Sequence, residues 1–127
     1  MEEVSKGSTF KDLKVWQRAM ELSLSTYRFT SSFPPTEHYG LSQQMRRAAV
    51  SVASNIAEGY GRSTSGEYLL FLGHARGSLC ELETQILLSR QLVFGPPEEA
   101  SNLEALCLET SRMLHGLYQA IERKKAS

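Results

Sequence analysis

Apolar residues recur along the chain at intervals of three or four, and nowhere do they alternate regularly with polar residues. Intervals of three or four place side chains on one face of an α-helix, whereas alternation is typical of a strand. Three stretches interrupt the pattern with proline, glycine or small polar residues, namely 33–40 (FPPTEHYG), 61–66 (GRSTSG) and 94–99 (FGPPEE). Such residues end helices and form turns. The pattern therefore predicts four helices and no strand.

Each predicted helix has a start signal and an apolar stripe. The first begins at Thr9, whose hydroxyl can cap it, with Asp12 in the first turn. The second spans about 42–60, the third opens with the capping-box pattern of residues 64–67 (TSGE), and the fourth begins near Pro97. The stripes expected to face the core are Leu13, Trp16, Met20, Leu24 and Tyr27; then Met45, Ala49, Val52, Ile56 and Gly59; then Tyr68, Leu72, Ala75, Leu79, Leu82 and Ile86; and finally Leu103, Leu106, Thr110, Met113 or Leu114, Leu117 and Ile121.

The connections between the predicted helices are short, so consecutive helices should pack antiparallel. We therefore expect an all-α protein, an up-down-up-down four-helix bundle over residues 9–122. Residues 1–8 are expected to be a disordered tail and residues 123–127 a frayed basic tail.

The second and third predicted helices have more apolar circumference than one core face requires. Either these two helices each touch two neighbours within the bundle, or a second copy of the chain covers the surplus. Leu70 and Leu88 should be exposed, and exposed apolar patches commonly mark association, which favours a subunit interface. The residues predicted to lie in that interface are Val50, Ala53, Ala57, Leu69, Cys80 and Leu87.

The stretch 46–62 (RRAAVSVASNIAEGYGR) adds polar residues to this small-residue surface. Arg46 is flanked by small apolar residues, so its guanidinium either extends to the rim or pairs with a carboxylate across an interface. Asn55 lies at the edge of the core, where a buried amide needs hydrogen-bond partners and can fix helix register. We interpret Arg46, Asn55 and Glu58 as structural. The candidate phosphate contacts for a nucleic-acid function are Arg46, Arg47, Arg62 and the tail residues Arg123, Lys124 and Lys125.

The composition narrows the function. The 127 residues fit one domain, and 14 basic residues balance 14 acidic ones, so no net charge draws the chain to polyanions. Cys80 and Cys107 show no metal-ligand spacing and are expected to be small buried hydrophobes in a reducing compartment. The N-terminal MEEVSKGSTF lacks the apolar run of a signal peptide, and no stretch is apolar enough to span a bilayer. We expect a cytoplasmic protein with no membrane partner.

Catalytic and metal-binding patterns are missing from the sequence. His38, His74 and His115 form no HxxxH or ExxH pair, so neither a zinc site nor a di-iron bundle is indicated. The GYGR stretch at residues 59–62 ends a helix rather than joining a strand to one, which excludes a phosphate-binding loop. We therefore expect no enzyme, no cofactor, no metal and no small-molecule substrate.

Three stretches carry a resemblance to a known family: FKDLKVWQRAMELSLSTY (10–27), YGLSQQMRRAAVSVASNIAEGYGR (39–62) and EYLLFLGHARGSLCELETQILLSRQL (67–92). Together they resemble the bacterial four-helix-bundle proteins encoded in intervening sequences of large-subunit ribosomal RNA genes. The resemblance covers about residues 10–94 and implies an antiparallel bundle that assembles into a homopentameric ring. The positions that match the signature of this family are Arg46, Arg47, Asn55, Glu58, Gly59 and Arg62.

The resemblance also suggests a kind of function. A relative of the family, the accessory protein of diversity-generating retroelements, is a basic pentameric barrel that binds a reverse transcriptase and nucleic acid. The present chain departs from that relative in having zero net charge. We expect a non-enzymatic homo-oligomer that associates with RNA or with a nucleic-acid-processing protein. The alternative is a scaffold or adaptor that contacts only proteins.

Overall fold

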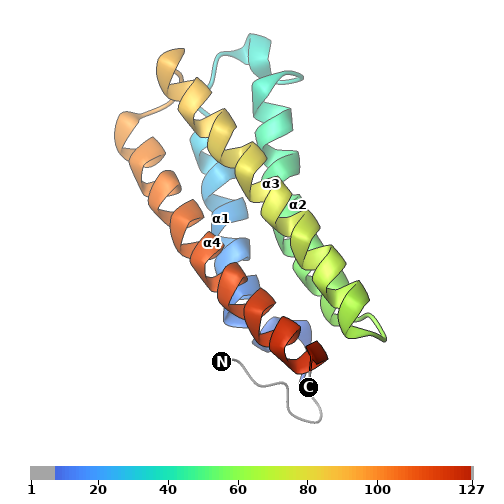
Figure 1. The fold of residues 1–127 in the computed structure, drawn as a ribbon. Coiled ribbons are helices and arrows are strands. Elements are labelled where there is room, and N and C mark those ends of the chain that lie inside the picture. Colours follow the sequence, from blue (N-terminus) through green and yellow to red (C-terminus); the bar gives the residue numbers. More distant parts are fainter. Residues whose placement is uncertain (1–7, 127) are drawn as a thin grey trace.

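The structure is a computed structural model that describes residues 8–126. Within this range its regular elements are all helices, which confirms the predicted all-α fold class (Figure 1). The elements are the 3-10 helix η1 (Phe10–Asp12), α1 (Lys14–Thr30), the 3-10 helix η2 (Pro35–Glu37), α2 (Leu41–Tyr60), α3 (Ser65–Gln91) and α4 (Pro97–Ala126).

The four long helices pack as an antiparallel bundle. Helix pairs α1/α2, α2/α3, α3/α4 and α1/α4 are in contact, whereas the diagonal pairs are not. Figure 1 shows the start of α1 and the end of α4 at the same end of the bundle. The up-down-up-down order follows from the short connections, because a short connection makes each helix pack antiparallel to the one before it.

The stripes predicted for α2 and α3 are confirmed. Every predicted residue of the α2 stripe is buried, and in α3 only Tyr68 is partly exposed. Helix α3 starts as predicted, because the Thr64 hydroxyl accepts a hydrogen bond from the backbone N–H of Glu67. In α4 the buried residues are Ala100, Leu103, Cys107, Thr110, Leu114, Leu117 and Ala120, so the predicted Leu106, Met113 and Ile121 lie at the edge of the core.

The stripe predicted for the first helix is largely wrong. Met20, Leu24 and Tyr27 are 40%, 54% and 46% exposed. The buried residues of α1 are instead Val15, Ala19, Leu22, Ser23, Thr26, Phe29 and Thr30. A search for apolar side chains misses this face because it contains hydroxyls. Two of these hydroxyls are satisfied within the helix: Thr26 donates to the Leu22 carbonyl at 2.7 Å and Thr30 to the Thr26 carbonyl at 2.8 Å.

The ends of the predicted bundle also shift. Thr9 and Asp12 form the expected capping box, but around η1, and α1 itself begins only at Lys14 after an extended Leu13. At the other end α4 continues through Ala126, so residues 123–126, predicted as a frayed tail, are helical. Cations there interact favourably with the C-terminal end of the helix dipole. Residues 1–7 and 127, which belong to the predicted tails, lie outside the described residues.

Candidate functional site

Arg46 joins α2 to the C-terminal turn of α1. Its Nε donates to Thr30 Oγ1 at 2.8 Å and a terminal nitrogen donates to the Tyr27 carbonyl at 3.3 Å. The guanidinium also lies over the Tyr27 ring, 4.6 Å from the centroid. The last carbonyls of a helix lack intrahelical partners and carry the negative end of the dipole, so a cation is favoured there. The sequence predicts that the Arg46 guanidinium either extends to the rim or pairs with a carboxylate. In the described part of the chain it does neither, because it forms its hydrogen bonds with α1 of the same chain.

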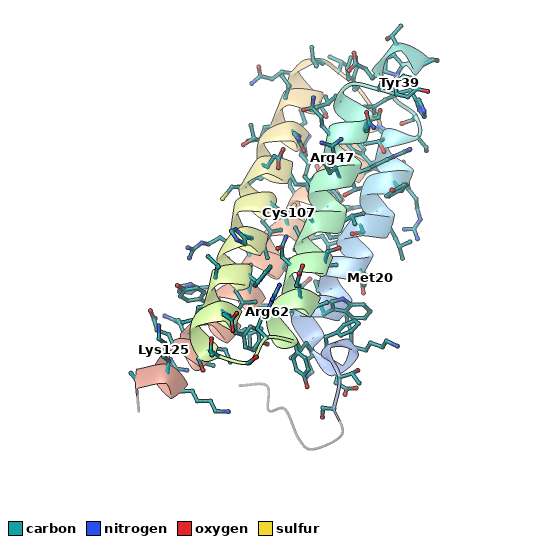
Figure 2. The ribbon with its side chains drawn as sticks, turned by 90° about the vertical axis from the view of Figure 1, so that its right-hand side faces the viewer. Met20, Tyr39, Arg47, Arg62, Cys107 and Lys125 are labelled. Carbon is teal, nitrogen blue, oxygen red and sulfur yellow. The ribbon has the colours of Figure 1, made fainter. Side chains whose placement is uncertain are left out.

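Beside Arg46 the surface forms a hollow of about 400 Å³. We call it the arginine hollow; its lining residues are Tyr27, His38, Tyr39, Gln43, Arg46, Arg47 and Val50. Figure 2 shows Tyr39 and Arg47 at the same end of the bundle. Arg47 is exposed, and no carboxylate among residues 8–126 forms an ion pair with it.

The charge around the arginine hollow differs from the zero net charge of the whole chain. The sequence has no acidic residue between Glu37 and Glu58, and the two arginines lie in this interval. Glu37 is already engaged, since its Oε1 accepts from the Leu41 backbone N–H at 3.1 Å and so caps α2. The first half of α2 is therefore locally positive.

Arg62, the third predicted phosphate contact, lies apart from this hollow (Figure 2). It is fifteen positions beyond Arg47, which corresponds to about 20 Å along a helix. Its guanidinium pairs with Glu58 at 2.9 Å and lies 4.4 Å from the centroid of the Phe71 ring. The structure thus brings Arg46 and Arg47 together, and it places Arg62 in a neutralised contact between α2 and α3.

Asn55 and Gly59 lie along the contact between α2 and α3. Asn55 donates from Nδ2 to the Ser51 carbonyl at 2.8 Å and to Ser51 Oγ at 2.9 Å. Ser78 on α3 donates to the same Ser51 Oγ at 2.9 Å. A Cβ on Gly59 would lie 2.9 Å from the Phe71 Cβ and 3.2 Å from the Tyr68 carbonyl oxygen. These contacts place Asn55 and Gly59 in the packing between α2 and α3.

Some of the residues predicted for a subunit interface are buried within the single chain, and the others are exposed. Ala53 and Leu69 are only 5% and 9% exposed within the single chain, and Ala57 is half-buried. They therefore offer little surface to a second copy. Val50, Cys80 and Leu87 remain exposed, together with Leu70 and Leu88 as expected.

Three of the exposed leucines lie on α3, on or beside the side opposite its buried stripe. We call this surface the α3 outer face, which consists of Leu70, Gly73, Gly77, Cys80, Leu87 and Leu88. No atom lies within 4 Å of a Cβ built on Gly73 or Gly77. The middle of this face is therefore open, with leucines towards both ends.

The two cysteines differ from one another. Cys107 is buried as predicted, and burial raises the pKa of its thiol from 9.0 to about 12, with Glu83 and Glu104 adding to the shift. Within the single chain the prediction of a buried Cys80 does not hold, because this residue is exposed on the α3 outer face. Helix α3 has apolar residues on both its inner and its outer side, so the apolar stretch around Cys80 does not show which side this residue is on.

Within residues 8–126, no group of three or more His, Cys, Asp or Glu side chains is placed to hold a metal ion. No helix of the same range has the length and hydropathy to cross a bilayer.

Comparison with known proteins identifies the family. The family model described as 23S rRNA-intervening sequence protein matches residues 11–116. The chain belongs to this family. The match extends beyond the resemblance seen in the sequence, which reached about residue 94, and includes most of α4.

This intervening-sequence protein shares its fold with a protein of solved crystal structure. The matching protein is one of unknown function from the S23 ribosomal protein family of Bacteroides thetaiotaomicron. It has a TM-score of 0.74 and 18% identity over 82% of this chain and 97% of the other. No curated protein matches the chain. Arg46, Arg47, Asn55, Glu58, Gly59 and Arg62 all lie within the range that the family model matches.

Proposed function

We propose that this intervening-sequence protein is a non-enzymatic cytoplasmic interaction protein that works as a homo-oligomer, with the α3 outer face covered by further copies. The observation that carries the proposal is the exposure of Leu70, Leu87 and Leu88, which are 56%, 49% and 46% exposed. Large apolar side chains left exposed on one face of a helix commonly mark an interaction site.

The shape of the α3 outer face suits a helix of another subunit. Gly73 and Gly77 allow a backbone to approach closely, and the leucines towards both ends supply the apolar area that a stable contact buries. If this face contacts a different face of the next copy, the contact is heterologous, and such contacts close into rings when the rotation permits. A ring of five is the assembly that the family resemblance implies, and we adopt it as the proposed state.

Light scattering coupled to size-exclusion chromatography tests the proposal. We expect the mass of five chains of 14.2 kDa, held over a dilution series. A stable single copy with the same helicity would overturn the assembly. Absorbance at 260 and 280 nm in the same run reports nucleic acid that copurifies.

A second candidate function, association with RNA, is favoured by the arginine hollow. Arg47 is exposed without a carboxylate partner in the described chain, and α2 has no acidic residue near it. Unpaired surface arginines bind phosphates, and repetition of the hollow around a ring would multiply a modest local charge. The competing possibility is an adaptor that binds only proteins, such as a nucleic-acid-processing enzyme.

A salt series separates these two possibilities. Phosphate contacts release counterions, so RNA affinity should fall steeply as the salt concentration rises. Binding that is absent at low salt, or that does not respond to salt, would favour the protein-only adaptor.

A further inference from the structure

The arginine hollow holds more than positive charge. Tyr39 is 83% exposed, the same exposed fraction as Val93 and above that of the other large hydrophobic side chains left exposed. Among residues 8–126 its ring meets the His38 ring alone in an aromatic contact, edge to face with centroids 4.6 Å apart and planes at 78°. An aromatic side chain left this open loses the stabilisation that burial would provide. Its ring is therefore available to stack against a ligand.

The floor of the hollow is held in place by contacts already described. Arg46 is bonded to α1 and lies over the Tyr27 ring, so neither side chain has to be ordered when a ligand arrives. Arg47 stands next to this floor with its donors free of any ion pair in residues 8–126. Binding to such a preorganised surface costs less conformational entropy.

The hollow is also lined by the Gln43 amide, which is exposed on α2. An amide both donates and accepts hydrogen bonds, so it can pair with the edge of a nucleobase. A free aromatic face, an arginine and an amide together match three features by which a nucleotide is recognised: the base plane, the phosphate and the base edge.

We propose that the arginine hollow binds an unpaired nucleotide of single-stranded RNA, with the base stacked on Tyr39, the phosphate at Arg47 and the base edge at Gln43. This proposal rests on the proposed association with RNA and specifies its substrate class. In a duplex the base faces are stacked on one another, so Tyr39 would have nothing to bind. The hollow has a volume of about 400 Å³, at the small end of the range for ligand sites.

The test uses the full-length assembled protein and a fluorescein-labelled oligouridine, with binding followed by fluorescence anisotropy at low salt. Tyr39→Ala should weaken binding by roughly 5- to 100-fold, the range for loss of one stacked base. Tyr39→Phe keeps the ring and should bind as the wild type does. Arg47→Ala should weaken binding and lower the slope of affinity against salt by about one.

Matched controls separate the stacked base from general charge. Arg112→Ala removes an exposed arginine from α4, which does not contact α2, and should leave affinity unchanged. A duplex of the same length should bind more weakly than the single strand. Light scattering of every variant should give the wild-type mass.

Three other outcomes would contradict the proposed binding of a single-stranded nucleotide. If the duplex binds as well as the single strand and Tyr39→Ala has no effect, the stacked nucleotide is wrong while RNA association stands. If free uridine monophosphate competes as well as the oligouridine, the hollow is a site for small nucleotides and the single-strand proposal is overturned. If no RNA binds even at low salt, RNA association fails as well and the protein-only adaptor is favoured.

Discussion

Gly59 on α2 lies so close to Phe71 on α3 that a Cβ on the glycine would stand 2.9 Å from the Cβ of Phe71. Real Cβ atoms do not approach other carbons so closely, and the Tyr68 carbonyl oxygen on the same side is only 3.2 Å away. The two helices therefore contact at a distance that glycine alone permits. The close contact explains why a residue that weakens helices stands near the end of α2.

Replacing Gly59 by alanine should destabilise the protein although alanine favours helices. Because the backbone of α3 cannot move away without disturbing the core, we expect a loss of about 1–3 kcal/mol in the free energy of unfolding. Urea denaturation followed by circular dichroism at one fixed protein concentration measures this loss. Gly116→Ala is the matched control: no atom lies within 4 Å of a Cβ there, so it should add about 0.4–1 kcal/mol. Equal effects of the two changes would contradict the close contact.

Introducing charge on the α3 outer face should dissociate the assembly. Leu70→Glu or Leu88→Glu would place a carboxylate in the buried contact, and we expect each to weaken association by at least about ten-fold with helicity unchanged. Leu24→Glu is the matched control, because Leu24 is equally exposed, at 54%, but lies on α1. Light scattering reads the mass of each variant. A Leu88→Glu variant of wild-type mass, or a Leu24→Glu variant that dissociates, would place the interface elsewhere.

The buried Cys107 thiol predicts a loss of stability at high pH. Its pKa is raised from 9.0 to about 12 by burial, so the folded chain keeps the proton at a pH where the unfolded chain has lost it. The contribution is fully present below about pH 9, and between pH 9 and 12 the free energy of unfolding falls by up to about 1.4 kcal/mol per pH unit. The comparison is with Cys107→Ala, which removes the thiol and leaves every other group unchanged. The variant should show a shallower decline; parallel pH curves would contradict the prediction.

Arg90 links the C-terminal end of α3 to the N-terminal part of α4. Its guanidinium donates to both carboxylate oxygens of Glu104, at 3.0 and 3.1 Å, and to the Ser101 hydroxyl at 2.7 Å. Both charged side chains are 32% exposed, so solvent screens the pair and we expect Arg90→Ala to cost only about 1 kcal/mol. Arg90→Lys keeps the charge but cannot form the two parallel bonds, and it should recover less than half of that loss. Thermal unfolding in low and high salt measures both variants, and full recovery by lysine would show that charge alone matters.

Much of the fold follows from the sequence because local signals and long-range packing agree over most of the chain. The clusters of proline, glycine and small polar residues at 33–40, 61–66 and 94–99 separate the helices, and the short connections between helices favour antiparallel neighbours. The stripe from Met45 to Gly59 is predicted correctly because its residues recur at intervals of three or four, and all of them are buried. In α1 the same method fails, since Thr26 and Thr30 are buried while Met20 and Leu24 are exposed.

The arginine hollow could be predicted only in part. The adjacent Arg46 and Arg47 are evident from the sequence, but their different roles are not. Arg46 reaches Thr30, sixteen positions earlier, and so becomes part of the floor. The hollow exists only because the connection that contains Tyr39 folds beside Tyr27 of α1. The sequence predicts Arg62 as a phosphate contact together with the other two arginines. In the structure it lies against Phe71, apart from the arginine hollow.

The number, order and approximate ends of the helices and the buried faces of α2 and α3 can be predicted from the sequence, because these depend on spacing and on residues that act locally. Which side of α1 is buried, which arginine is engaged and which leucines remain exposed become known from the folded structure. Those outcomes depend on which helices become neighbours. A threonine that satisfies its own hydroxyl within a helix can replace an apolar residue in the core, and an arginine can reach across to the end of another helix. Neither contact is encoded at any fixed distance along the chain.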